Sequence, residues 1–406
     1  MKIGFVSAWF ERGAAYVTKQ FRSALQEKNE TFIYARGGEM YAKGDPNWDG
    51  PEVTWGLKLY GTAISPSHIL NWIDSNEIQL VFFNEQHDLE PVLTVKKQRP
   101  HVILGTYVDY YKASTISDFR FYDFLVCNTR RHYSVFQWHP QCFYVPWGTD
   151  TELFSCARDE TDRSARFFHS VGMSNRKGTE FVIDAFIKGK LYEESKLIIH
   201  TQVDINKTLG IDTSLFPSYN IEYVHASVPA PGLYHKGNVY VYPTKLDGLG
   251  LTIYEALSCG MPVITTDNAP MNEIVSNEIG KLIPVEKFVS RADGYYWPLS
   301  IVKIDELIKG MRYYIENADR LFEFGRAARD YAEGKLNWNE RKYKINEVFE
   351  NVAANPQDVT DISSELKRIK RKKRLVFGKA CLDLLPANLQ HLVYSRHNPG
   401  KKKGVR

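Results

Sequence analysis

Short apolar runs alternate with helix-length segments along most of the chain, and this alternation limits the possible folds more than any other feature. The runs cover residues 2–9, 31–36, 79–84, 101–108, 124–129 and 142–146 in the first half, and 167–172, 196–201, 221–226, 239–244, 262–267 and 280–285 in the second. Several are apolar at consecutive positions, as is typical of strands buried on both faces of a parallel sheet. Their spacing suits helices that connect parallel strands. The sequence therefore predicts an α/β protein built from doubly wound, Rossmann-like sheets.

The alternation is interrupted at residues 146–166, where proline and glycine precede a charged stretch of weak periodicity. A chain of 406 residues is also long enough for two domains with separate cores. Helices are expected to dominate from Ile301 to about Ala354. The predicted parts are a first Rossmann-like domain at 1–150, a second at 151–336, a closing helix at 337–354 and a basic tail at 355–406.

The stretch DGLGLTIYEALSCGMPVITTD, which begins at Asp247, places two acids around a turn that contains glycines. It is predicted to pass from a strand into a helix, with Thr252 as a cap and Glu255 in the first turns. Gly248 and Gly250 allow a ligand to approach the backbone closely. The N–H groups at a helix N-terminus suit a diphosphate. By itself the pattern also fits an ordinary glycine-rich turn with solvated or capping acids.

This stretch resembles the nucleotide-binding signature of retaining glycosyltransferases of family 4, which have the GT-B fold of two Rossmann-like domains facing a cleft. Asp247 and Glu255 match the two acids of the family's E-x7-E motif, with Asp in place of the first Glu. The other matching positions are Gly248, Gly250, Ala256, Gly260 and Pro262. The resemblance implies that Asp247 contacts the donor sugar, that Glu255 contacts the ribose, and that the backbone of Gly248, Leu249, Gly250 and Leu251 approaches the diphosphate.

Further matches occur in the family's order over about residues 1–353. PWGTDTELF, from Pro146, resembles the segment between the domains, and LNWNERKYKINEVF resembles the closing helix that crosses back to the N-terminal domain. SVGMSNRKGTEF resembles the loop whose Arg and Lys grip the donor diphosphate. Here Lys177 matches, Met173 stands in the usual place of the Arg, and Arg176 is the candidate substitute.

Transfer of a glycosyl group from a nucleotide sugar places negative charge on the leaving phosphate while the sugar becomes oxocarbenium-like. A fixed cation and helix-end amides directed at that charge stabilise the transition state by several kcal/mol. Lys177 and the backbone of residues 248–251 are the candidates, although a lysine before a helix is in general a surface residue. No Asp-x-Asp motif is placed as a metal site. The resemblance implies a metal-independent enzyme without a cofactor that retains the anomeric configuration.

Three loops of the first half are candidates for the other wall of the cleft. The first, ERGAAYVTKQF, resembles the family's glycine-containing loop and places Gly13 near donor and acceptor. NEQHD, the second, supplies His87 and Asp88. The third, TYVDYYK, supplies Tyr107 and Asp109.

The usual acceptor-side histidine of the family is missing from this third loop, where Val108 takes its place. His87 is therefore the candidate catalytic histidine, beside the alternative that it is only structural. The acceptor-side candidates are His87, Asp88, Asp109 and Tyr107.

Five scattered cysteines without a CxxC spacing indicate a reducing compartment rather than a disulfide framework or a zinc site. The apolar N-terminal run is predicted to be a core strand, not a signal peptide. No apolar stretch approaches the roughly 20 residues that a membrane helix needs. We therefore expect a cytoplasmic protein.

The C-terminal part is strongly basic, since residues 363–406 carry thirteen Lys or Arg residues and two acids, against a net charge of +4 for the whole chain. A cationic block at 367–374 precedes apolar residues at 375–377 and 382–385. Anionic lipid attracts such a block by about 1 kcal/mol per basic residue, and apolar neighbours can enter the interface. Three interpretations stay open: peripheral binding at the inner face of the membrane through residues 367–385, a solvated tail and, least favoured, a nucleic-acid-binding arm.

The sequence thus predicts a hexosyltransferase-type enzyme that moves a sugar from a nucleotide-diphosphate donor to a saccharide or a lipid-linked glycan in surface polysaccharide synthesis. Two alternatives stay open. One is a nucleotide-sugar epimerase or hydrolase of the same fold, and the other is a non-catalytic binding protein with a degenerate site. A dehydrogenase is disfavoured because WFERGAA follows the first strand in place of a GxGxxG turn.

Overall fold

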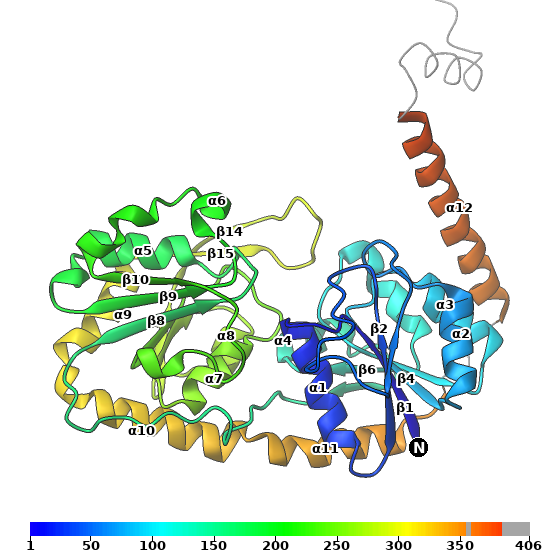
Figure 1. Cartoon of the computed structure of the whole chain (residues 1–406), viewed down its shortest axis with the longest axis horizontal. Helices are drawn as coiled ribbons and strands as arrows, with labels where there is room; N and C mark the ends of the chain where they lie inside the picture. The colour runs from blue at the N-terminus through cyan, green and yellow to red at the C-terminus, as the bar shows by residue number, and fades with distance from the viewer. Residues whose placement is uncertain (355–358, 384–406) are drawn as a thin grey trace, which may run out of the picture.

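The chain folds into two α/β domains that lie side by side (Figure 1). A computed structural model describes residues 1–354 and 359–383, with backbone alone at 359 and 376–383. Each domain is built on one parallel sheet, of seven strands in the N-terminal domain and six in the C-terminal domain. The predicted pair of doubly wound Rossmann-like sheets is therefore confirmed.

The N-terminal sheet has the order β3-β2-β1-β4-β5-β6-β7, and all its pairings are parallel. Its strands are β1 (Lys2–Ser7), β2 (Glu30–Ala35), β3 (Val53–Trp55), β4 (Leu80–Asn84), β5 (Ile103–Tyr107), β6 (Phe124–Cys127) and β7 (Cys142–Tyr144). The helices are α1 (Gly13–Leu25), α2 (Pro66–Ser75), α3 (Glu90–Gln98) and α4 (Arg130–Phe136), with the 3-10 helix η1 (Ala113–Phe121). Every residue of β4 and β6 is buried, which explains their unbroken apolar runs.

The C-terminal sheet has the order β10-β9-β8-β11-β12-β13 and is also parallel throughout. Its strands are β8 (Arg166–Val171), β9 (Lys196–Thr201), β10 (Ile221–His225), β11 (Val239–Tyr242), β12 (Val263–Thr266) and β13 (Gly280–Ile283). The α-helices are α5 (Thr179–Lys188), α6 (Ile205–Leu209), α7 (Leu251–Ser258), α8 (Met271–Ile274), α9 (Ile304–Glu316) and α10 (Leu321–Tyr331). Shorter helical turns are η2 (Leu191–Glu193), η3 (Thr213–Tyr219), η4 (Tyr234–Lys236), η5 (Ala318–Arg320) and the π-helix η6 (Ala332–Leu336).

An antiparallel hairpin follows the last parallel strand, and the sequence analysis did not anticipate it. It consists of β14 (Val285–Val289) and β15 (Leu299–Val302). Helices dominate from Ile304 to Asn351 as expected, although the first of them begins three residues later than Ile301, which lies in β15. The loop of this hairpin extends toward the N-terminal domain (Figure 1).

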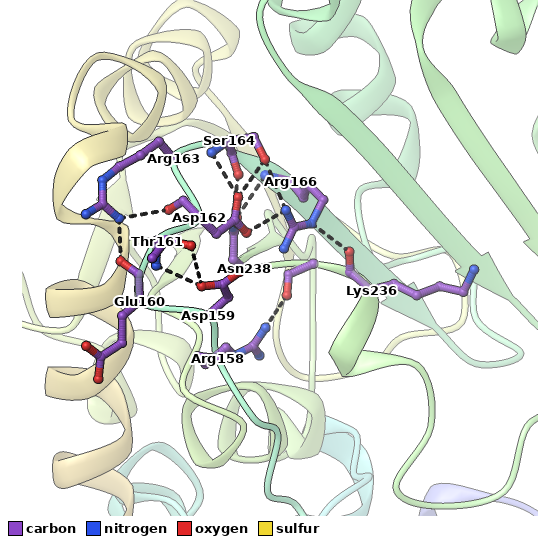
Figure 2. A network of polar contacts seen from close by, with 11 residues as sticks. Arg158, Asp159, Glu160, Thr161, Asp162, Arg163, Ser164, Arg166, Lys236 and Asn238 are labelled. Atoms are coloured by element: carbon purple, nitrogen blue, oxygen red, sulfur yellow. Dashed lines mark hydrogen bonds and ion pairs between the residues drawn. The ribbon is translucent and has the colours of Figure 1, made fainter.

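The segment between the domains is fixed to the C-terminal domain before β8 begins (Figure 2). The Arg158 side chain donates to the carbonyls of Cys259 and Gly237. The Asn238 amide oxygen accepts from the N–H of Arg166 at 2.8 Å, and its Nδ2 donates to the carbonyl of Ser164 at 2.8 Å. This charged stretch is therefore an ordered edge of the C-terminal domain rather than a loose linker.

The chain crosses between the domains a second time through α11 (Trp338–Asn351), which packs along α1. Asn346 of α11 donates to the carbonyl of Ala24 at 2.7 Å. The two crossings are themselves hydrogen-bonded, since Thr149 N donates to Leu336 O at 2.7 Å and Trp338 N donates to Thr149 O at 2.9 Å. One apolar core runs through both domains at this place.

Helix α12 (Val359–Asp383) contains the whole cationic block at 367–374 and packs on α3. Its residues Ile362 and Leu366 are buried against Leu93 and Phe121. Part of the predicted tail is therefore a docked helix. The apolar residues predicted at 382–385 fall within or beyond the part for which only backbone is given, and residues 384–406 lie outside the described chain.

The packing predicts that α11 holds the domains together through Phe349, which is 2% exposed and lies 5.1 Å from the ring of Phe82 and 5.3 Å from that of Phe124. Phe349→Ala should lower the free energy of unfolding by about 3–5 kcal/mol, because it leaves a cavity in this core. Urea unfolding measures the loss. Tyr343→Ala on the same helix, where Tyr343 is 81% exposed, is the control and should change stability by less than about 0.5 kcal/mol. Equal losses in both variants would contradict this role of α11.

Candidate active site

A cavity of 910 Å³ lies between the two domains, where the carboxyl ends of the parallel strands face each other. Its N-terminal wall includes the loops after β1, β2, β4 and β5, and its C-terminal wall includes the loops after β8, β9, β10 and β11 and part of α7. Ten of the predicted site residues line it: Gly13, Tyr107, Asp109, Arg176, Lys177, Asp247, Gly248, Leu249, Leu251 and Glu255. Three predicted residues do not, namely His87, Asp88 and Gly250.

The turn at residues 247–250, here called the glycine loop, leads from β11 into α7. Gly250 is the N-cap of α7 and has a φ of 80°, a left-handed conformation that glycine adopts without strain. Thr252 lies inside the helix, so the prediction that it caps α7 was wrong. A Cβ at Gly248 would stand 1.9 Å from a carboxylate oxygen of Asp109, which requires glycine where the two domains approach.

Asp247 forms an ion pair with Lys177 across the C-terminal wall of the cavity. The Tyr242 hydroxyl donates to the same carboxylate at 2.5 Å. Although burial opposes ionisation, Lys177 and the Tyr242 hydroxyl hold the pKa of Asp247 well below its usual range. The two residues that the sequence assigned to the sugar and the phosphate are therefore direct neighbours, and Asp247 carries a negative charge at neutral pH.

Glu255, in the second turn of α7, has a different environment. Burial raises its pKa to about 7, and the hydrogen bond from the Tyr234 hydroxyl, at 2.5 Å, opposes this shift only in part. The carboxyl group therefore exchanges its proton near neutral pH and can accept hydrogen bonds from ligand hydroxyls when ionised.

Arg176 lines the cavity beside Lys177, and its Nε donates to the Ser174 hydroxyl at 3.3 Å. Met173, at the position where the resembling family carries an arginine, is 56% exposed and also lines the cavity. The structure thus places a guanidinium in the same loop, three residues after Met173.

Asp109 lies on the opposite wall, at the end of β5. Burial, together with the carboxylates of Glu85 and Asp247, raises its pKa to about 7. Glu85, Asp109 and Asp247 therefore line the same cavity from three different loops, and their mutual repulsion favours ligands that donate hydrogen bonds or bring positive charge.

The sequence analysis missed a charged cluster on the N-terminal wall. The Arg12 guanidinium lies 2.8 Å from a carboxylate oxygen of Glu39 and 2.8 Å from one of Glu85, and all three residues line the cavity. Glu11 lines it as well and accepts from the Tyr16 hydroxyl at 2.6 Å. Arg12 and Glu85 were visible in two of the three candidate loops, but nothing in the sequence connected them, since they are 73 positions apart.

The predicted acceptor-side residues His87 and Asp88 lie at the outer edge of this wall. His87 is exposed, and its ring lies 4.8 Å from that of Tyr110. Asp88 pairs with Lys373 of α12 at 2.7 Å. The predicted catalytic role of His87 stays a prediction, and Glu85 and Asp109, unlike His87, line the cavity. Among the described residues, no three His, Cys, Asp or Glu side chains are grouped as metal ligands.

The pKa of Glu255 predicts a pH-dependent cost to folding. In the unfolded chain the carboxyl ionises near 4.5, whereas in the folded chain it holds its proton up to about pH 7, so wild-type stability falls between these values as the pH rises. Glutamine does not ionise, so Glu255→Gln does not lose this stability as the pH rises. The difference in free energy of unfolding, variant minus wild type, should therefore increase by on the order of 1–3 kcal/mol from pH 5 to pH 8. Urea unfolding at both pH values tests this, with Glu286→Gln on exposed β14 as the control. A difference from wild type that is equal at both pH values would contradict the prediction.

Comparison with known proteins agrees with this geometry. Residues 165–293 match the family model described as "Glycosyl transferases group 1". A stretch of 47 residues is 40% identical to O-antigen chain mannosyltransferase B of Escherichia coli, and it spans 12% of this chain and 12% of that relative.

Solved structures extend the similarity to both domains. Sucrose-phosphate synthase from Thermosynechococcus elongatus is 14% identical with a TM-score of 0.66, over 86% of this chain and 98% of that one. HepE from Anabaena, in complex with UDP-glucose, is 14% identical with a TM-score of 0.65, over 87% of this chain and 100% of that one. The chain therefore has the GT-B fold, and its residues 165–293 match the family model of the group 1 glycosyl transferases.

Proposed function

We propose that the protein is a retaining glycosyltransferase of family 4 that uses a nucleotide-diphosphate sugar. One observation carries the proposal. A single interdomain cavity joins the Lys177–Asp247 pair, the N-terminus of α7 and Glu255, within a domain that matches the group 1 glycosyl transferases. Neighbours of the same fold have been solved with UDP or UDP-glucose, which supports a nucleotide-sugar donor.

The proposed donor site assigns one task to each group. Glu255 accepts hydrogen bonds from the ribose hydroxyls, and the amides at the start of α7 bind the diphosphate. Lys177 and Arg176 face the charge that develops on the leaving phosphate. Asp247, already ionised beside Lys177, accepts hydrogen bonds from sugar hydroxyls. Donor binding places phosphate oxygens next to Lys177, so its ammonium group is shared between Asp247 and the phosphate in the proposed complex.

On the acceptor side, the wall carries Glu11, Glu39, Glu85 and Asp109 with Arg12 as the accompanying cation. Ionised carboxylates accept hydrogen bonds and donate none, which suits the hydroxyl groups of a saccharide. The proposed acceptor is therefore a saccharide or a lipid-linked glycan in surface polysaccharide synthesis. The partial identity to an O-antigen chain mannosyltransferase supports the same class. Metal independence and hexosyl transfer are part of the proposal.

The test is donor binding followed by sugar transfer. A nucleotide sugar at one hundred times its Kd should stabilise the folded chain by about 2.7 kcal/mol, and a panel of UDP and GDP sugars identifies the donor by thermal shift. Glu255→Ala should abolish the shift, and Lys177→Met should lower kcat/KM by at least about a hundredfold. Glu286→Ala, on exposed β14, is the control.

The same assay separates the alternatives. An epimerase or hydrolase would consume the donor at the same rate with and without a saccharide acceptor. A binding protein with a degenerate site would show a rise in melting temperature with a nucleotide sugar but would not convert that sugar. Absence of any thermal shift across the panel would contradict the proposal as a whole.

We also propose that α12 docks on an anionic lipid surface. Lys367, Arg371 and Arg374 recur at helical spacing and are exposed, and Leu375 beside them is 66% exposed. The opposite face of α12 is occupied by α3, which leaves the basic face outward. In the described part of the chain, no helix is both long and apolar enough to cross a bilayer.

Sedimentation with phosphatidylglycerol vesicles tests this docking. The intact chain should bind these vesicles and not phosphatidylcholine vesicles. Changing Lys367, Arg371 and Arg374 together to Glu should remove about 3 kcal/mol of attraction, at about 1 kcal/mol per basic residue. The control changes exposed Lys207, Lys188 and Lys309 of the C-terminal domain to Glu. Equal binding by the two triple variants would contradict a specific role of α12.

A further inference from the structure

The loop of the β14–β15 hairpin, residues 290–298, reaches from the C-terminal domain onto the loop that follows β5 in the N-terminal domain. The Tyr295 hydroxyl donates to the carbonyl of Asp109 at 3.1 Å. Tyr296 N donates to the carbonyl of Tyr111 at 3.0 Å, and Trp297 Nε1 donates to the Tyr111 hydroxyl at 2.6 Å. The hairpin is thus bound to the wall of the cavity that carries Asp109.

From Tyr111 the hydrogen bonds continue to the glycine loop. The Tyr111 hydroxyl lies 3.1 Å from His132 Nδ1, and His132 Nε2 lies 3.2 Å from the carbonyl of Gly248. Both side chains are buried. Burial lowers the pKa of His132 to about 3, so the ring is neutral at physiological pH and carries one N–H.

The chemistry of the two ends fixes the direction of every bond in this chain of groups. An indole N–H only donates and a backbone carbonyl only accepts. Trp297 therefore donates to Tyr111, the Tyr111 hydroxyl donates to His132 Nδ1, and His132 Nε2–H donates to the carbonyl of Gly248. Each group has the partner that its single hydrogen requires.

The neighbouring residue of α4 holds the preceding carbonyl of the same loop. The Arg131 guanidinium donates to the carbonyl of Asp247 at 2.5 Å and to the carbonyl of Ala269. The first turn of α4 is anchored by Glu273, whose carboxylate accepts from the N–H groups of Arg130 and Arg131 at 2.6 and 2.9 Å. Two consecutive carbonyls of the glycine loop are therefore bound by a helix of the other domain.

We propose that Trp297, Tyr111 and His132 are positioning residues that fix the backbone of the glycine loop through a chain of hydrogen bonds that crosses the domain interface twice. The C=O and N–H of a trans peptide point in opposite directions. Holding the carbonyls of Asp247 and Gly248 on α4 therefore turns the amides of Gly248 and Leu249 away from α4. If the proposed function holds, this backbone contributes to the diphosphate site, so the inference rests on that function for its catalytic consequence alone.

The first test is amide hydrogen exchange of the unliganded full chain, read on a peptide that covers residues 247–252. Trp297→Phe removes the indole N–H and leaves a smaller aromatic ring, and Tyr111→Phe removes the hydroxyl and keeps the ring. Each should speed exchange of this peptide about fivefold, as expected for the loss of one hydrogen bond worth about 1 kcal/mol. Tyr296→Phe is the matched control, because it removes a hydroxyl from the same loop at a residue that is 41% exposed. The chain of hydrogen bonds from Trp297 through Tyr111 and His132 to Gly248 is called the relay below. If Trp297→Phe and Tyr111→Phe exchange this peptide no faster than the control, the proposal is overturned.

The second test uses activity in the same variants. The relay variants should lower kcat about fivefold, leave the KM for the acceptor unchanged and unfold within a few degrees of wild type. The double variant Trp297→Phe/Tyr111→Phe should be no slower than Tyr111→Phe, because the two changes break one chain of bonds. If the fold-losses in kcat of the two single variants multiply in the double variant, the relay is overturned.

The two readouts separate this proposal from the proposed function. A wild-type chain that binds no nucleotide sugar contradicts the proposed function. The exchange measurement still tests whether the relay holds the glycine loop, because it needs no ligand.

Discussion

The packing of aromatic side chains where the chain crosses between the domains is the constraint on which the rest of the structure depends. The rings of Phe21 and Trp147 lie 5.8 Å apart, and those of Trp147 and Trp338 lie 4.9 Å apart, so both crossings and α1 share one core. Since each parallel sheet collects its loops at one edge, this core determines that the two loop edges face each other. The cavity is a consequence of that arrangement, and the groups discussed above reach it from these loops or, like Glu255, from the helix that follows one of them.

Within the cavity, two acids of one motif acquire different properties because their neighbours differ. Asp247 has an ammonium group and a phenol beside it and stays ionised. Glu255 accepts a hydrogen bond from the Tyr234 hydroxyl and has no cation paired with it in the described part of the chain, and burial raises its pKa to about 7. These surroundings, rather than the side-chain type, give a fixed negative charge near the proposed sugar position. They also give a carboxyl that exchanges its proton near the proposed ribose position.

Local patterns predicted the strands and most of the residues that line the C-terminal wall of the cavity, because both depend on short stretches of sequence. Apolar runs identified β4 and β11, and the spacing of acids and glycines identified the glycine loop. Contacts between distant residues could not be predicted this way. The Arg12–Glu85 pair and the bond from His132 to Gly248 join residues 73 and 116 positions apart. The hairpin was missed because β14 is largely exposed and lacks a buried apolar run. His87 was selected as a histidine in a loop after a strand, and in the structure it is exposed and does not line the cavity.

The hydrogen-bonded pair of crossings at Thr149 and Trp338 has a mechanical consequence. Two short chain segments that pair with each other behave as one hinge, and rotation about their common line strains few bonds. Points near such an axis move little, whereas points across the cavity from it sweep long arcs. Trp147 would therefore remain nearly stationary during a hinge motion, and the contacts that Tyr295 makes with Asp109 would open first.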